Sequence, residues 1–319
     1  MNAVMSGPAA ASIAEFRNVT KWYGPVIGVN DVSVVLEPGI TGLLGHNGAG
    51  KTTLIKLLTG QLRPSLGKVR VGGHAAISAA AKRRLGYCPD VDTFYEEMSG
   101  RRFVQMMARF HGMDAPTSQE RADTVLEQVG MADRADRRLR GYSKGMRQRI
   151  KLAQALVHNP DLLIVDEPLN GVDPVGRREL MDLFRSFRDQ GKAVLVSSHI
   201  LDEMEFLADR IVFMGRGRVV AIGALSEIRN MLDEYPLNVL IRAPRVREVA
   251  VELVQWPLVR SVSLRSDQEL SAEILRPDEF FRQFAGFVAA SEAQIDALKT
   301  TDVSAEAVFE YVMSASRKF

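Results

Sequence analysis

The feature that most constrains this chain is a glycine-rich loop at residues 45–53, which reads Gly-His-Asn-Gly-Ala-Gly-Lys-Thr-Thr. The loop matches the pattern G-x-x-x-x-G-K-[ST] without a gap. Its glycines permit backbone angles that a Cβ would forbid, so successive N–H groups can converge on an anion. The apolar run 40–44 before the loop predicts a buried strand, and residues 53–59 after it predict a helix. This order predicts an α/β fold that binds the phosphates of a nucleoside triphosphate at the helix N-terminus.

Two residues of this phosphate loop have predicted roles of their own. Lys51 would place a point charge against the β- and γ-phosphates, and Thr52 would offer its hydroxyl to Mg²⁺. The other residues would surround the phosphates, chiefly with backbone N–H groups. The predicted nucleotide-binding residues of the loop are Gly45, His46, Asn47, Gly48, Ala49, Gly50, Lys51, Thr52 and Thr53.

Composition excludes several other classes of protein. Of the 319 residues, 46% are apolar and 25% are charged, with a formal net charge of +2, so neither nucleic acid nor an acidic membrane surface is expected as the main partner. The single cysteine, Cys88, excludes an internal disulfide framework and fits a reducing cytoplasm. No stretch of about 18 uninterrupted apolar residues occurs, so no membrane span is expected. Residues 1–12 lack the features of a secretion signal, and we expect a disordered tail there.

Strand-like and helical patterns alternate from about residue 14 to residue 222. This alternation predicts an α/β domain over residues 13–223 with a mixed, mainly parallel sheet. Residues 15–23 and 29–36 predict strands of an early β lobe, and residues of about 91–157 predict a helical subdomain. After residue 223 the pattern becomes βαββαα without a second phosphate loop, which predicts a small α+β appendage over residues 224–319.

Two carboxylates end an apolar strand predicted at residues 162–165. Ligands of open α/β sheets bind beyond the carboxyl ends of the strands, so Asp166 and Glu167 should reach the nucleotide. Asp166 would hold Mg²⁺ together with Thr52, and Glu167 would act as the general base for water. The alternative is a solvated acidic turn, which the phosphate loop upstream disfavours.

A histidine and a second anion-binding segment complete the predicted site. His199 follows the next apolar strand, at the same edge of the sheet, where an imidazole could contact the γ-phosphate and the water. The alternative for His199 is an ordinary surface residue. Residues 142–149, the signature segment, open a helix predicted at 150–156, and Ser143 and Gly145 offer a second anion-binding helix start.

Together these elements resemble the ATP-binding-cassette (ABC) ATPases, in family order and spacing over about 210 residues. The resemblance implies an ATPase whose cofactors are ATP and Mg²⁺. It implies that two cassettes pair head to tail, each ATP lying between one chain's phosphate loop and the partner chain's signature segment. It also implies that Tyr23 stacks on adenine, a packed strand tyrosine being the alternative, and that the loop at Asp173 couples the two sites. The elements are residues 45–53, 142–149, 162–168, 170–173 and His199.

Within this family the chain resembles the ATP-binding subunits of the type-2 export group. The Tyr-Ser-Lys-Gly-Met run from residue 142, the Asp-Glu-Pro-Leu-Asn-Gly-Val-Asp-Pro run from residue 166 and a C-terminal segment of nearly 100 residues match that group. The resemblance implies a homodimer that energises export by a separately encoded integral-membrane permease. It also implies a peripheral location on the cytoplasmic face of the inner or plasma membrane, with residues 91–103 receiving the permease.

Two departures from the family pattern stand out. The usual signature is Leu-Ser-Gly-Gly-Gln, and here Tyr142, Lys144 and Met146 differ while Ser143 and Gly145 are kept. The family glutamine that links the metal site to the membrane partner aligns with Asp90. An aspartate there could bind the metal or water through a shorter side chain, but it adds negative charge near the other carboxylates.

Two other functions are compatible with parts of the sequence. A soluble ABC ATPase acting on nucleic acid or ribosomes would use the eight basic residues, against two acidic ones, in the stretch 133–151. Salt-sensitive binding to RNA or DNA would favour it. A regulator that binds ATP without turnover is the third possibility, and the presence of Glu167 and His199 argues against it.

Overall fold

The structure, a computed structural model, describes residues 12–224, 227–228, 237–290 and 294–300. The chain divides into two units, Met1–Ile222 and Gly223–Phe319, each described by itself. The tail predicted over residues 1–12 lies outside the described residues except for Ser12, and so does the last predicted helix, at 304–315.

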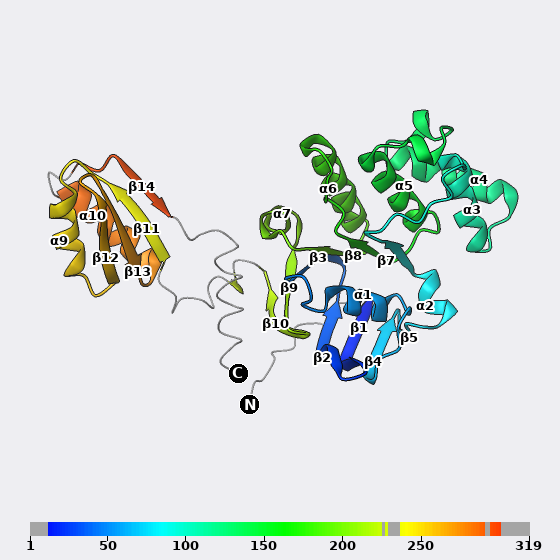
Figure 1. The fold of residues 1–319 in the computed structure, drawn as a ribbon, viewed down its shortest axis with the longest axis horizontal. Helices are drawn as coiled ribbons and strands as arrows, with labels where there is room; N and C mark the ends of the chain where they lie inside the picture. Colours follow the sequence, from blue (N-terminus) through cyan, green and yellow to red (C-terminus); the bar gives the residue numbers. More distant parts are fainter. Residues whose placement is uncertain (1–11, 225–226, 229–236, 291–293, 301–319) are drawn as a thin grey trace. The chain divides into compact units, whose positions relative to one another are not determined.

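A six-stranded sheet with the order β10-β9-β3-β8-β7-β6 forms the centre of the first unit (Figure 1). The five strands from β9 to β6 are parallel, and the inner strands β3, β7 and β8 are buried along all or nearly all of their length, as expected for a sheet covered on both faces. The predicted mixed, mainly parallel sheet is confirmed. The strands are β3 (Gly39–Leu44), β6 (Leu85–Cys88), β7 (Leu162–Asp166), β8 (Ala193–Ser198), β9 (Arg210–Gly215) and β10 (Arg218–Gly223).

The register of this sheet places three loops side by side. Leu44, the last residue of β3, pairs with Ser198, the last of β8, and Asp166, the last of β7, pairs with Ser197. The chain leaves β3 into the phosphate loop and then enters α1 (Lys51–Leu58). The predicted site residues at these strand ends therefore share one edge of the sheet.

The early β lobe is an antiparallel sheet with the order β2-β1-β4-β5. Its strands β1 (Ala14–Tyr23) and β2 (Val26–Leu36) confirm the two predicted strands. Two further strands of the lobe, β4 (Leu66–Val71) and β5 (His74–Ala75), were not predicted, because β4 buries only Val69 and Val71 and β5 has two residues. A short helix, α2 (Ala79–Arg83), follows the lobe.

Three helices form the helical subdomain: α3 (Gly100–Phe110), α4 (Ala115–Gln128) and α5 (Lys144–Leu156). The side chains of Ser99, Asp114 and Ser143 cap their N-termini by accepting backbone N–H groups. The cap at Ser143 starts α5 at Lys144, six residues before the predicted start. Two further helices, α6 (Pro174–Asp189) and α7 (Leu201–Leu207), contact the central sheet.

The second unit has the element order βαββαβ with an antiparallel sheet ordered β12-β13-β11-β14. This arrangement is a split βαβ fold. Its core includes Trp256, Phe280 and Phe284. The predicted βαββαα pattern missed β14, whose four residues are mostly exposed. The elements are β11 (Leu237–Arg242), α9 (Val246–Val254), β12 (Val259–Ser266), β13 (Glu269–Ile274), α10 (Pro277–Ala290) and β14 (Ala297–Thr300).

Candidate active site

The phosphate loop has a backbone that only glycine fits at two positions. A Cβ on Gly45 would lie 2.7 Å from the Met214 carbonyl oxygen, and one on Gly50 would lie 2.7 Å from the Gly28 carbonyl oxygen. Gly48, with φ 82°, faces open space instead. No side chain caps α1 at Gly50, so its first N–H groups remain available to an anion.

The Lys51 ammonium group contacts a carbonyl and a carboxylate, in positions that phosphate oxygens could take when a nucleotide binds. Its Nζ donates to the Gly45 carbonyl and lies 3.8 Å from Glu167 Oε1. Burial lowers the pKa of Lys51, and the charges of Glu167 and Asp166 oppose that effect. Thr52, next to it, is exposed in the first turn of α1. The side chain of Lys51 therefore lies between the loop and the carboxylates.

Ser197 organises the two predicted carboxylates. Its Oγ donates to Asp166 Oδ1 and accepts the backbone N–H of Glu167 at 3.0 Å. Burial raises the pKa of Asp166, the Ser197 hydrogen bond lowers it, and the charge of Asp90 raises it further. Ser197 was not a predicted site residue, although its hydroxyl at the end of the neighbouring strand was an available signal.

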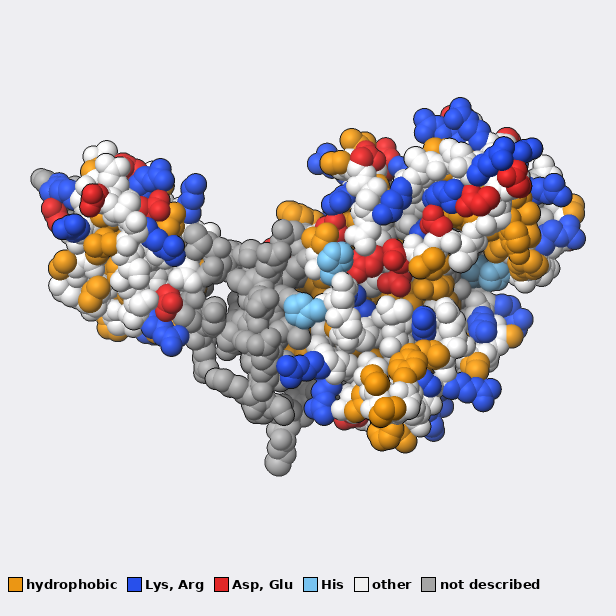
Figure 2. Space-filling model, viewed as in Figure 1, with side chains coloured by type: hydrophobic (Ala, Val, Ile, Leu, Met, Phe, Trp, Pro, Cys, Tyr) orange, Lys and Arg blue, Asp and Glu red, His pale blue; other side chains and the backbone are white. Residues whose placement is uncertain are grey.

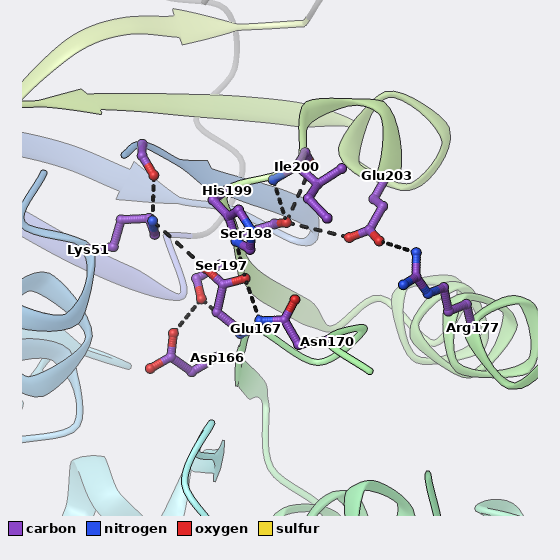
Figure 3. A network of polar contacts seen from close by, with 11 residues as sticks. Lys51, Asp166, Glu167, Asn170, Arg177, Ser197, Ser198, His199, Ile200 and Glu203 are labelled. Carbon is purple, nitrogen blue, oxygen red and sulfur yellow. Dashed lines mark hydrogen bonds and ion pairs between the residues drawn. The ribbon is translucent and has the colours of Figure 1, made fainter. Parts of the chain in front are cut away.

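Glu167 and His199 are brought together (Figure 3). His199 Nδ1 lies 2.9 Å from Glu167 Oε2, and Asn170 Nδ2 donates to the same oxygen at 3.3 Å. The Glu167 side chain is 14% exposed and that of His199 is 47% exposed. On the face drawn in Figure 2, acidic and histidine side chains gather between the helical subdomain and the β lobe. Asn170 was not predicted as a site residue.

Asp90 is exposed, and its backbone carbonyl accepts a hydrogen bond from Lys151 Nζ at 2.8 Å. Its carboxylate is near enough to raise the pKa of Asp166. Cys88, at the end of β6, is fully buried and accepts a hydrogen bond from Gln148 Nε2 of α5 at 3.5 Å. The segment after β6 is thus attached to the signature helix, and metal binding by Asp90 stays a prediction.

The oxygen donors at this edge suit Mg²⁺, which proteins usually bind through one or two carboxylates together with substrate phosphates. Asp166 and the Thr52 hydroxyl supply such oxygens. The described residues contain no group of three or more His, Cys, Asp and Glu side chains that could hold a metal ion alone. A magnesium ion held by these two residues would take its remaining ligands from phosphate oxygens and water.

The signature residues Ser143 and Gly145 lie at the start of α5. Ser143 is exposed and its Oγ caps α5 by accepting Met146 N–H at 3.3 Å. A Cβ on Gly145 would meet nothing within 4 Å. The start of α5 therefore has room for a further group beside Ser143 and Gly145.

Tyr23 and Lys144 have contacts that the sequence did not specify. Tyr23 is 43% exposed, and its hydroxyl lies 3.4 Å from Thr53 Oγ1. Its ring is thus adjacent to the phosphate loop, and adenine stacking stays a prediction. A Cβ on Gly171 would collide with the Lys144 side chain, so Lys144 lies over the loop 170–173.

The chain is similar to known ATP-binding proteins of one family. Residues 29–170 match the family model described as ABC transporter. The uncharacterized ABC transporter ATP-binding protein YhcH of Bacillus subtilis is 39% identical over 227 residues, which cover 70% of this chain and 72% of YhcH. The daunorubicin resistance ATP-binding protein DrrA3 of Streptomyces coeruleorubidus is 36% identical over 253 residues, covering 78% of this chain and 79% of DrrA3.

Solved structures show the same fold. An ATP-binding subunit of an ABC transporter superposes with a TM-score of 0.64 at 28% identity, over 69% of this chain and 93% of that one. A dimeric ATP-binding cassette bound to ADP and phosphate has a TM-score of 0.61 at 21% identity, over 66% of this chain and 98% of that one. The second match supports the fold alone.

Proposed function

This chain belongs to the ATP-binding subunits of the ABC transporter family, and we propose that two copies enclose two ATP molecules and hydrolyse them to drive export by a separate integral-membrane permease. Membership of the family implies ATP binding and hydrolysis. The observation that carries the proposal is the convergence of Lys51, Glu167 and His199 at one edge of the central sheet.

ATP binding would exchange contacts at the phosphate loop. Lys51 would leave the Gly45 carbonyl and Glu167 for the β- and γ-phosphates, which are stronger partners for an ammonium group. The uncapped N–H groups at the start of α1 would take the remaining phosphate oxygens. The exposed ring of Tyr23 would cover the adenine.

Hydrolysis would begin when Glu167 accepts a proton from a water molecule that attacks the γ-phosphorus. The bond to the β–γ bridging oxygen breaks, leaving ADP and phosphate. Bound Mg²⁺, held by Asp166 and Thr52, would neutralise phosphate charge. His199 and Asn170 hold the Glu167 carboxylate in place, and His199 would also contact the γ-phosphate.

A second chain would complete each site. Ser143 is exposed and the space beside Gly145 is open, so the signature segment could approach a partner's γ-phosphate without rearrangement of its own chain. A solved cassette of similar fold is described as dimeric and bound to ADP and phosphate, which is consistent with this proposal. A homodimer is the simplest arrangement for one gene product.

The permease is proposed from the relatives and from one surface. DrrA3 is described as a resistance protein for daunorubicin, and transported substrates in such systems would be selected by the membrane partner. In the described part of this chain, no helix is long and apolar enough to cross a membrane. Val91 and Tyr95, 69% and 61% exposed, lie in the segment 91–103 that would receive the permease at the cytoplasmic face.

The basic stretch 133–151 gives little support to the nucleic-acid alternative. Arg147 donates two hydrogen bonds to Glu96, at 2.7 and 2.8 Å, and Arg138 and Arg140 both pair with Glu97. Their charges are thus largely engaged inside the helical subdomain. A phosphate backbone would have to displace these carboxylates.

The test is the variant Glu167→Gln, which keeps the shape of the side chain but cannot accept the proton. We expect ATP hydrolysis to fall by about a hundredfold or more, with an ATP-dependent dimer accumulating in size-exclusion chromatography. Lys51→Ala is the matched control, because it should lose ATP binding and form no such dimer. Undiminished turnover in Glu167→Gln would refute the assignment of the base.

A further inference from the structure

The guanidinium of Arg177 joins two segments that flank catalytic side chains. Arg177 lies in the first turn of α6, directly after the loop 170–173. Its Nε donates to the Val172 carbonyl at 2.9 Å, and its Nη1 donates to Glu203 Oε1 at 2.8 Å. Two donors of one planar group are engaged, which fixes the direction of both bonds. The first bond holds the loop that follows Glu167.

Glu203, in α7, carries the connection to the turn around His199 (Figure 3). The Ser198 hydroxyl lies 3.5 Å from Glu203 Oε2 and 3.3 Å from the Ile200 carbonyl oxygen, and it accepts the Ile200 N–H at 3.0 Å. Ser198 and Ile200 are the two neighbours of His199. The carboxylate of Glu203 therefore contacts the turn 198–200 on one side and Arg177 on the other.

Charge gives this pair a second consequence. The Glu203 side chain is only 10% exposed, so its carboxylate depends on Arg177, which is 38% exposed, for compensation. Burial raises the pKa of Glu203, Arg177 lowers it, and the nearby charge of Glu167 raises it. Without Arg177, an unpaired carboxylate would remain near the proposed general base.

We infer that Arg177 and Glu203 are positioning residues for hydrolysis. Together they tie the loop 170–173 to the turn 198–200, and so hold His199 Nδ1 2.9 Å from Glu167 Oε2. We assign neither side chain a direct contact with ATP. The inference rests on the proposed catalytic roles of Glu167 and His199.

The experiment compares Arg177→Gln and Glu203→Gln with a control from the same helix pair. Arg185 also joins α6 to α7, donating to the Phe206 carbonyl at 2.7 Å, but its hydrogen bonds go to Asp182 and Phe206 and to neither catalytic segment. Steady-state ATP hydrolysis by the full chain should show kcat lower by about tenfold in both positioning variants, with KM changed less than about twofold. The control Arg185→Gln should keep the wild-type kcat.

Two further readouts separate positioning from folding. The double variant should lose no more kcat than either single variant, because both remove the same connection. Arg177→Lys, which keeps the charge but reaches only one of the two partners, should be intermediate. Thermal unfolding should show every variant folded at the assay temperature, although Arg177→Gln, which leaves the buried Glu203 carboxylate unpaired, should unfold at a lower temperature than Arg185→Gln.

Three outcomes would overturn the inference. Unchanged kcat in both positioning variants would remove it while leaving the proposed function intact. An equal loss of kcat in Arg185→Gln would show that general contact between α6 and α7, not this pair, is what matters. A wild-type chain without ATPase activity, or full turnover in Glu167→Gln, would remove the proposed function and this inference with it.

Discussion

Glu167 has a backbone φ of 48°, in the left-handed region that costs a non-glycine residue about 1–3 kcal/mol. Contacts of Glu167 itself stabilise this conformation: its N–H donates to Ser197, and its carboxylate contacts His199 and Asn170. The sequence predicted two acids at a strand end, since strand ends face ligands in such sheets. It could not predict the left-handed turn, which depends on a hydroxyl 30 residues later.

Asp90 offers a prediction at the residue scale. Its negative charge raises the pKa of Asp166, so a neutral residue at position 90 should lower that pKa. Protons compete with Mg²⁺ for Asp166, and metal affinity therefore falls as pH falls through its pKa. In Asp90→Asn and in Asp90→Gln, we expect that fall to move to lower pH. Half-saturating Mg²⁺ concentrations for ATP hydrolysis, measured from pH 5 to 8, would show it.

The two variants separate charge from length. Asparagine keeps the length of aspartate, whereas glutamine restores the residue of the family pattern. A shift shared by both identifies charge as the cause, and a profile that stays at the wild-type position in both would contradict the electrostatic account.

Among the helices and strands, the most buried strands were the ones that the sequence predicted best. Fully buried strands such as β3, β7 and β8 are continuous apolar runs, and each was predicted within one or two residues. Short or half-buried strands, β4, β5 and β14, have no comparable signal because their neighbours, not their own residues, select the strand conformation. The start of α5 was misplaced because apolar periodicity begins later than the Ser143 cap.

The helical subdomain meets the central sheet at a pair of stacked histidines. The rings of His111, after α3, and His158, after α5, lie 3.7 Å apart and nearly parallel. His158 Nε2 donates to the Leu85 carbonyl at 3.0 Å, while Nδ1 is buried without a partner. Burial, followed by the charge of His111, lowers the pKa of His158 to about 4.

This pKa predicts acid sensitivity of the fold. Histidine in an unfolded chain has a pKa of about 6.5. Below that pH the unfolded chain therefore binds a proton at position 158, whereas folded His158 stays neutral until the pH approaches 4. The stability that neutral His158 provides is complete above about pH 6.5 and is lost progressively toward pH 4. In His158→Phe, the unfolding temperature should depend less on pH between 7.5 and 5, as measured by scanning calorimetry. His74→Gln, which removes an exposed histidine, should keep the wild-type slope; equal slopes in all three proteins would exclude the mechanism.

At the scale of the whole molecule, we propose that the phosphate loop of one chain is completed by the signature segment of a second chain. The sequence could predict this only through family resemblance, because no local pattern says that a helix start serves another molecule. The structure supports it through the exposed Ser143 and the open space at Gly145. The residues of this chain do not identify the transported substrate, because the proposed membrane partner would select it.

Mixing two inactive variants tests the shared site. Lys51→Ala removes phosphate binding by a chain's own loop. Gly145→Asp places a negative charge where the partner's phosphate would lie, in space that is open in this chain. Each homodimer should be inactive. In an equal mixture, half the dimers combine both chains and each has one intact site of two, so about one quarter of wild-type ATPase activity should return. No recovery after mixing would mean that each site is built from one chain.

The buried thiol of Cys88 has a practical consequence. Burial raises its pKa to about 12, so at neutral pH it is a protonated, enclosed thiol that alkylating reagents cannot attack. Reagents would reach it only while β6 and Gln148 of α5 are apart. The chain has one cysteine, so the rate at which a thiol reagent labels the native protein measures how often β6 and α5 separate at Cys88. The measurement needs no engineered residue.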